Sequence, residues 1–465
     1  MEGRRWETRS LDALRSAMML LVFTGHYSMC FYTFKWYAGG QFAVNGFMSI
    51  SFTTMIVAYH LPVTAVRPEP VRTRKYALFV CKRLARLLPL FYLHKLSGWL
   101  LTKWVTCVHD PHWDEHYASE GLDTFNEIAP RLDWAASVIW ITPDGSGANT
   151  LFTSVHLWFL ETMLWLYLVF PFVVEWVGSS SQFRLLPDFV RCVALSLAGI
   201  ATTVCWLRYA ALPALDVPED HAFFDSFIVF GLRANPLCRV FTMALTIKAT
   251  LAVTRGQWVP SRVCVLTVLS SLLVLLLFAI KSSFVNYIVP IVNSTLAHRI
   301  VPSLASHDDI VTFFNWGHNG ADLASMFAWG LAAPIFVHLE KHHREGVNWV
   351  LRLPPMRLLV ALSRFSLSFY VWQMAAIQLL QLQVTKLTSG TATCYHQVPN
   401  MPWYNVPALP DGFKATLYLP AVSQLLLLAI MSHYLVEEPS NALLKGLAVS
   451  LLDRGSSTAK RPVMI

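Results

Sequence analysis

Residues 263–281, VCVLTVLSSLLVLLLFAIK, decide the class of fold, because they form an apolar run that carries a charge only at its last residue. A run of this length can cross the roughly 30 Å hydrocarbon core of a bilayer as a helix. Similar runs lie near 14–34, 42–62, 77–101, 155–177, 189–211, 225–252, 321–339, 357–382 and 414–436. The sequence therefore predicts an all-α, polytopic transmembrane helix bundle of about ten spans.

The composition of the whole chain agrees with this prediction. Of 465 residues, 55% are hydrophobic and only 14% are charged, whereas soluble domains carry about 25% charged residues. Soluble, disordered and disulfide-scaffold classes are therefore excluded. We expect one multipass domain over residues 1–440 and a short cytosolic tail over 441–465. The net charge of +8 is explained by basic cytosolic loops, and no nucleic-acid partner is expected.

The distribution of charge predicts the orientation of the spans. Basic residues gather in the amino-terminal tail, in every second loop and in the carboxy-terminal tail. Segment 103–153 instead holds eight acidic residues and two basic ones. By the positive-inside rule, both termini are predicted to be cytosolic, and segment 103–153 is predicted to lie on the opposite side.

The first span contains the most informative pair of ionisable residues, Arg15 and His26. Eleven helical steps bring both side chains to nearly the same face, with a rise of roughly 16 Å between them. Arg15 is therefore expected near the cytosolic rim and His26 near the middle of the membrane. Ionisable groups inside spans are costly and usually functional, although a snorkelling arginine and a structural histidine would give the same pattern.

A second basic element opens the third span. Arg83 and Arg86 are three residues apart, in the pattern Arg-x-x-Arg-x-x-Pro that ends at Pro89. Residues at this spacing share one side of a helix, and planar guanidinium groups suit phosphate ligands. The pattern alone is more typical of a positive-inside anchor.

Together these patterns resemble the membrane acyltransferase type 3 family. The chain shows Arg-x10-His in the first span and Arg-x-x-Arg-x-x-Pro in the third. Further motifs follow in family order. Residues 44–51 (VNGFMSIS) resemble "GVDxFFxxSG", and 156–160 (HLWFL) resemble "HLWxL". Residues 235–239, with Asn235, Pro236 and Arg239, resemble the family's Pro/Arg-bearing helix. Residues 363–372 (SRFSLSFYVW) resemble "GxxSYxxYLxH", and 434–439 (YLVEEP) resemble "IExP". The resemblance spans residues 12 to 439.

The resemblance implies an integral membrane O-acyltransferase, transferring groups other than aminoacyl groups. It would move an acyl group, with acetyl expected, from cytosolic acyl-CoA to a hydroxyl of a carbohydrate, lipid or small-molecule acceptor. Acyl-CoA would be a co-substrate, with no permanently bound cofactor or metal. Arg83, Arg86 and Arg15 would hold its phosphates, and His26 would act on the proton. Second-tier site candidates in the motifs are His156, Glu161, Ser51, Tyr370 and Glu437.

Whether His26 deprotonates the acceptor or is itself acylated stays open at this stage. The base role is favoured, since direct transfer requires only one proton acceptor. Four positions depart from the family pattern. Asn45 stands where Asp is usual and Gln373 where His is usual. Thr242 lies near the position of a usual Glu, and Met163 replaces the first residue of a common Glu pair.

Other interpretations compete with the enzyme. A proton-coupled transporter or exporter could also use an intramembrane His and Arg. The ordered motifs and the Arg-x-x-Arg element favour the enzyme. Segment 109–116 (HDPHWDEH) contains metal-ligand residue types, but a solvated loop explains it better. Asn293 begins a glycosylation sequon, and Cys107 and Cys394 are expected to pair if the compartment is oxidising.

Overall fold

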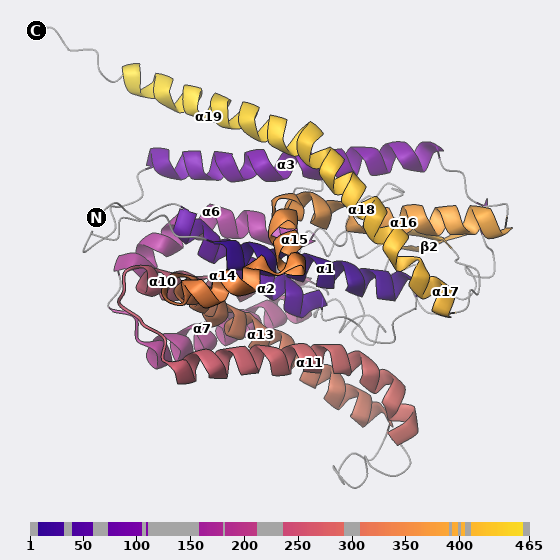
Figure 1. Ribbon diagram of the computed structural model, residues 1–465, viewed down its shortest axis with the longest axis horizontal. Helices are drawn as coiled ribbons and strands as arrows, with labels where there is room; N and C mark the ends of the chain where they lie inside the picture. The colour runs from indigo at the N-terminus through magenta and orange to yellow at the C-terminus, as the bar shows by residue number, and fades with distance from the viewer. Residues whose placement is uncertain are drawn as a thin grey trace, which may run out of the picture.

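The computed structural model describes residues 8–31, 40–58, 73–104, 108–109, 158–179, 182–211, 236–292, 307–389, 393–398, 401–404 and 411–458. Most of these residues form long helices that run side by side (Figure 1). The first are α1 (Arg9–Phe31), α2 (Gly40–Ala58), α3 (Thr73–Trp104), α6 (Trp158–Ser179), α7 (Leu185–Trp206), α10 (Leu237–Thr254) and α11 (Arg262–Val292). They are followed by α13 (His307–His342), α14 (Arg344–Arg352), α15 (Pro354–Leu362), α16 (Ser366–Ser389), α17 (Asp411–Thr416), α18 (Tyr418–Ser432) and α19 (Glu438–Thr458).

The predicted polytopic helical bundle is confirmed. Each of the ten apolar runs overlaps one of these helices. Within the described residues, six helices are long and apolar enough to cross a membrane, and two shorter apolar helices accompany them. The number ten itself stays a prediction. Short turns of other helix types, η2 (Leu207–Ala211), η3 (Ser363–Phe365) and η4 (His433–Glu437), join or extend the long helices.

Three short strands form a small sheet that the sequence analysis did not anticipate. Strand β1 (Val108–His109) pairs in parallel with β2 (Thr393–Val398), which pairs antiparallel with β3 (Met401–Tyr404). In this register His109 lies opposite Cys394. The sheet joins the segment after α3 to the segment after α16. Cys107 lies outside the described residues, so the Cys107–Cys394 disulfide stays a prediction, and the sequon at 293–295 also lies outside them.

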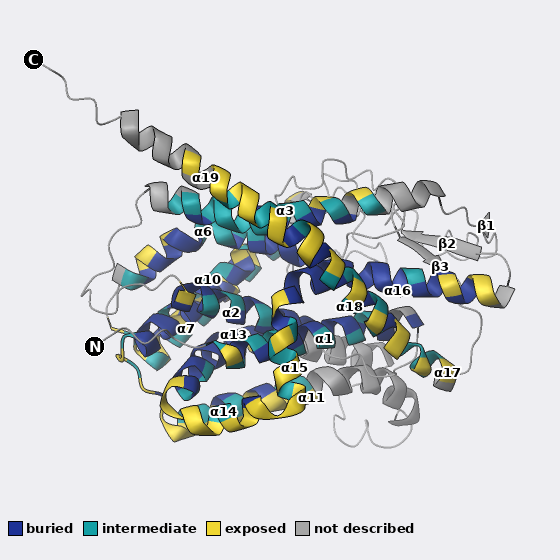
Figure 2. Ribbon diagram, turned by 45° about the horizontal axis from the view of Figure 1, so that its top comes forward, coloured by how far each residue is buried: buried dark blue, intermediate teal, exposed yellow. Residues whose placement is uncertain are grey.

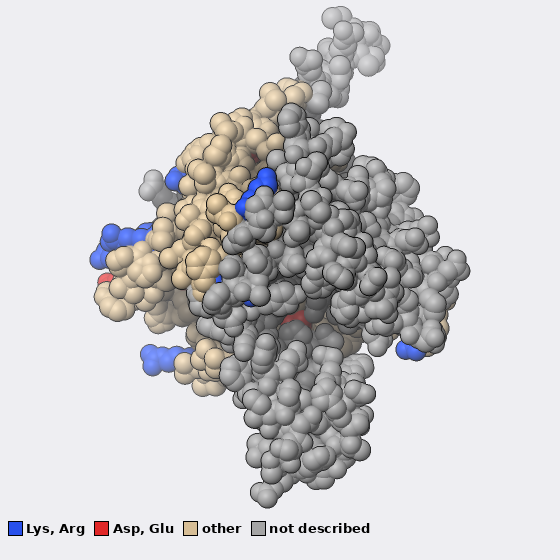
Figure 3. Space-filling model, turned by 90° about the vertical axis from the view of Figure 1, so that its right-hand side faces the viewer, with Lys and Arg blue, Asp and Glu red and all other residues tan. Residues whose placement is uncertain are grey.

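Burial separates a central group of helices from a peripheral group. Most residues of α2, α10 and α16 are buried, whereas few residues of α7, α18 and α19 are buried (Figure 2). The exposed side chains include many large apolar ones, such as Leu186, Tyr209 and Leu435. Seen from the right-hand end of Figure 1, the described surface shows few charged side chains (Figure 3). This pattern is typical of helices that face lipid.

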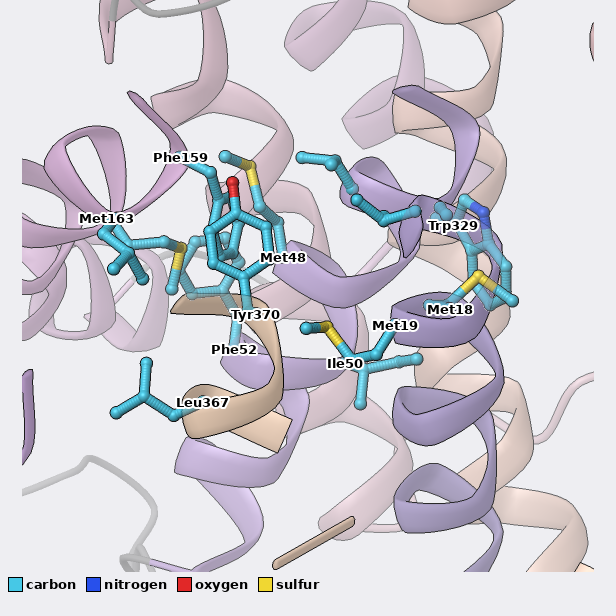
Figure 4. Packing of buried hydrophobic residues seen from close by; sticks show 14 of the residues in the cluster. Met18, Met19, Met48, Ile50, Phe52, Phe159, Met163, Trp329, Leu367 and Tyr370 are labelled. Atoms are coloured by element: carbon cyan, nitrogen blue, oxygen red, sulfur yellow. The ribbon is translucent and has the colours of Figure 1, made fainter. Parts of the chain in front are cut away.

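The centre of the bundle is packed closely where α1, α2 and α13 meet. A Cβ atom added to Gly46 would lie 2.7 Å from the Trp329 ring and 3.1 Å from the sulfur of Met18. Figure 4 shows Met18 against Trp329 in this core. Small residues allow such close approach between membrane helices. Gly46 therefore fixes the distance of α2 from its two neighbours.

The first turn of α1 is held by a side chain from α13. One carboxylate oxygen of Glu340 accepts a hydrogen bond from the backbone N–H of Arg9 at 3.0 Å, and the other accepts from that of Ser10 at 3.3 Å. The Ser10 hydroxyl also donates to it. The first N–H groups of a helix have no partner within the helix, so Glu340 acts as a cap. It sets the position of α1, the helix that holds Arg15 and His26.

Candidate functional site

Arg15 is fixed between α1 and α2. Its Nη1 donates to Oδ1 of Asp12 at 3.0 Å, and its Nη2 donates to the hydroxyl of Thr54 on α2 at 3.0 Å. The Thr54 hydroxyl in turn donates to the carbonyl of Ile50 at 2.7 Å. The side chain of Arg15 is only 14% exposed. Its guanidinium group is therefore held in one position by contacts with two helices. A snorkelling arginine would not be held in this way.

Arg83 and Arg86 on α3 lie near Arg15. Both lie close enough to Arg15 for their positive charges to repel it. The guanidinium of Arg83 lies over the ring of Phe79 at 5.4 Å and over the ring of Tyr167 on α6 at 5.7 Å. These are cation–π distances. The structure thus gathers the three predicted phosphate ligands at the end of the bundle where α1 begins.

Glu437 orients Arg86. Its Oε1 accepts a hydrogen bond from Nε of Arg86 at 3.1 Å. Its Oε2 accepts from the hydroxyl of Ser368 at 2.8 Å and lies 3.0 Å from Nδ1 of His433. Glu437 is 3% exposed and closes the π-helical turn η4. Such turns are rare and frequent at functional sites. Glu437, a second-tier site candidate, therefore lies directly beside Arg86, one of the predicted phosphate ligands.

His26 lies further along α1, on the side of α16. Eleven residues separate it from Arg15, a rise of roughly 16 Å. The side chain of Gln373 on α16 lies close to the His26 imidazole. Gln373 is fully buried, so the contact is shielded from bulk water. Gln373 is also the residue that replaces a usual His in the family pattern, and the structure places it beside the predicted base.

A second histidine, which the sequence analysis missed, lies near the same part of α16. His94 on α3 is fully buried, and its ring packs on that of Trp372 at 5.3 Å between centroids. Trp372 directly precedes Gln373 in the chain. In the sequence, His94 stands out only as a histidine eight residues after Arg86 on the same helix. That spacing indicates a place near the site only once α3 and α16 are known to be neighbours.

Two of the remaining candidates, Tyr370 and Ser51, lie on helices of the central group. The ring of Tyr370 is buried and packs edge-on against Phe159 at 5.1 Å between centroids (Figure 4). Ser51 is half-buried on α2, three residues before Thr54. His156 and the side chain of Glu161 lie outside the described residues. The structure therefore brings together Arg15, Arg83, Arg86 and Glu437, and it leaves the roles of all candidates as predictions.

Two departures from the family pattern meet in one place. Asn45 accepts a hydrogen bond from Nη1 of Arg239 and donates to the hydroxyl of Ser325 at 2.7 Å. Asn45, Arg239 and Thr242 all line a small cavity between α2, α10 and α13. The Asp and Glu expected from the resemblance would both stand near Arg239. Both replacements therefore take a carboxylate away from the surroundings of the same buried arginine, Arg239.

Among the residues that the structure describes, no group of three His, Cys, Asp or Glu side chains is arranged to hold a metal ion. Most of segment 109–116 lies outside those residues, so its interpretation as a solvated loop is untested. Five cysteines in the described part of the chain are free thiols: Cys81, Cys192, Cys205, Cys238 and Cys264.

Comparison with known proteins agrees with the motifs. A family model described as an acyltransferase domain (Acyl_transf_3) matches residues 8–422, which is most of the chain. No curated protein and no solved structure matches the chain.

Proposed function

The chain belongs to the membrane acyltransferase type 3 family, and from this we propose that it is an integral membrane O-acyltransferase that uses acyl-CoA. It transfers an acyl group, with acetyl expected, to a hydroxyl of a carbohydrate, lipid or small-molecule acceptor. The proposal rests above all on one observation. Arg15, Arg83 and Arg86 converge at one end of the bundle, and His26 lies deeper on the same helix as Arg15.

The donor end of the site suits a phosphate-bearing ligand. Three guanidinium groups supply charge-assisted hydrogen-bond donors, which bind phosphate oxygens more strongly than neutral donors do. Arg86 is held through Nε, so its two terminal nitrogens are presented in a fixed plane. The basic loops on this side are predicted to be cytosolic, which is the side where acyl-CoA is available.

The depth of His26 suits the reacting end of the same ligand. The roughly 16 Å between Arg15 and His26 along α1 is of the order of the reach of an extended phosphopantetheine arm. In the proposed step, His26 accepts the proton of the acceptor hydroxyl while the hydroxyl oxygen forms a bond to the thioester carbonyl carbon. The carbon–sulfur bond then breaks, and the CoA thiolate takes up the proton. His26 ends the cycle neutral and unmodified.

The experiment is a comparison of metabolites by mass spectrometry. Glycans, lipids and small molecules are extracted from cells that express the wild type, His26→Ala or His343→Ala. His343 is an exposed residue far along the chain from His26 and serves as the matched control. The proposal predicts an acylated product that disappears only with His26→Ala. An acylation pattern that is identical in all three strains would contradict it.

A further inference from the structure

Helix α19 lies along α3 and brings another cation to the donor end of the site. The two helices are in extensive contact, and α19 runs beside α3 in Figure 1. Lys445, half-buried on α19, lies close enough to Lys82, Arg83 and Arg86 for their charges to repel. The sequence analysis had assigned this segment to a cytosolic tail.

The resulting group of charges is strongly unbalanced. Its cations are Arg15, Lys82, Arg83, Arg86 and Lys445, and we call this set the cationic cluster. Two described carboxylates pair with it: Asp12 pairs with Arg15, and Glu437 pairs with Arg86. Five cations against two carboxylates leave a net charge of +3. Like charges at short range destabilise the folded chain, so the cluster favours a ligand with several negative charges.

The cluster has two sides. Arg83 faces α6, because its guanidinium lies over the ring of Tyr167. Lys82 and Arg86 are four residues apart and therefore share a face of α3. Arg86 meets Glu437, the residue that directly precedes α19. Lys82, Arg86 and Lys445 thus lie where α3 meets η4 and α19, whereas the guanidinium of the neighbouring Arg83 is directed toward α6.

We propose that Lys82 and Lys445 form, with Arg86, a second anion subsite that binds the phosphomonoester on the nucleotide end of the donor. This deepens the proposed function and rests on it. In acyl-CoA that group is the 3′-phosphate, which is distant from the diphosphate that joins the pantetheine arm. A lysine ammonium is a compact point charge with three rotatable donors, well suited to a terminal phosphate. One ligand then engages the whole cationic cluster.

The test compares two ligands that differ only in this phosphate. Binding of CoA and of dephospho-CoA, which lacks the 3′-phosphate, is measured by calorimetry on full-length protein in nanodiscs of neutral lipid. The wild type is expected to bind CoA at least about 10-fold more tightly, the effect of one charge-assisted contact. Lys445→Gln and Lys82→Gln should each remove most of this preference and leave the affinity for dephospho-CoA unchanged.

Lys386→Gln is the matched control, because Lys386 is exposed on α16 and lies outside the cluster. It should bind both ligands as the wild type does. The proposal is overturned if the wild type does not discriminate between the ligands, or if Lys445→Gln weakens both equally or neither. If Lys445 instead binds an anionic lipid headgroup, Lys445→Gln should weaken the binding of neither ligand. Failure of the proposed function looks different, since the wild type would then bind neither ligand.

Discussion

Nε of Arg86 donates a hydrogen bond to Oε1 of Glu437 at 3.1 Å, which joins α3 to the turn that precedes α19. A guanidinium group has five N–H donors in one plane. A bond at Nε fixes that plane and leaves the terminal nitrogens to other ligands. Glu437 is itself held by Ser368 and His433. The orientation of Arg86 therefore depends on three helical segments at once.

Arg86→Ala should weaken donor binding. Loss of a charge-assisted contact costs about 1.5–3 kcal/mol, so the Kd for CoA should rise about 10- to 100-fold. Arg86→Lys keeps the charge but cannot bind Glu437 and a phosphate in one plane, and it should recover only part of the affinity. Calorimetry on purified protein measures both variants. Wild-type affinity in folded Arg86→Ala would rule out Arg86 as a donor ligand.

His26→Gln should abolish turnover while leaving donor binding intact. Glutamine keeps hydrogen-bonding capacity but has no titratable nitrogen, and a positioned acid–base group contributes about 100- to 10,000-fold to the rate. The measurement is acyl transfer from labelled acyl-CoA, with CoA affinity determined in parallel. If His26→Gln transfers acyl groups at the wild-type rate, His26 is not the base.

Gln373→Leu should lower kcat and leave the KM for the donor unchanged. Gln373 lies close to the His26 imidazole, and a hydrogen bond formed between them during the reaction would be worth about 0.5–1.5 kcal/mol, or roughly 2- to 10-fold in rate. Gln373→His keeps a hydrogen-bonding side chain beside His26 and should retain most of the rate. A change in donor KM with an unchanged kcat would contradict a role for Gln373 in positioning His26.

Glu340→Ala should destabilise the protein by releasing the first turn of α1. Loss of a capping side chain costs about 0.5–2 kcal/mol, and here the Ser10 hydroxyl also loses its acceptor. Thermal unfolding in detergent should occur at a lower temperature than in the wild type. Glu345→Ala, at an exposed position on α14, is the control and should unfold as the wild type does. Equal unfolding temperatures for both variants would refute the capping role.

Both termini are predicted to be cytosolic. Tags at residues 1 and 465 should be protected from protease in intact cells, whereas a tag near residue 118 should be cleaved. This follows from the basic loops and from the acidic character of segment 103–153. Opposite accessibility of the two termini would exclude an even number of spans.

The elements that the sequence predicted well are those fixed by local periodicity. Apolar runs of about 20 residues indicate membrane helices whatever their neighbours are, and each predicted run overlaps a helix. The common face of Arg15 and His26 follows from 3.6 residues per turn. The strands β2 and β3 were missed because they lie in a segment between spans, where no apolar run indicates structure. Helix α19 crosses the predicted boundary at 440 and 441, and that boundary stays a prediction.

The sequence by itself therefore determined a helical membrane bundle, its family, and the individual candidates Arg15, His26, Arg83 and Arg86. Only the tertiary structure decided which of them meet. Glu437 and Arg86 are 351 residues apart in the chain, and the contacts of Gln373 with His26 and of Lys445 with the α3 cations are also long-range. Helical periodicity assigns a residue to a face of its own helix, but the neighbour of that face is set by how side chains of different helices fit together. That fit is a property of the whole packed chain.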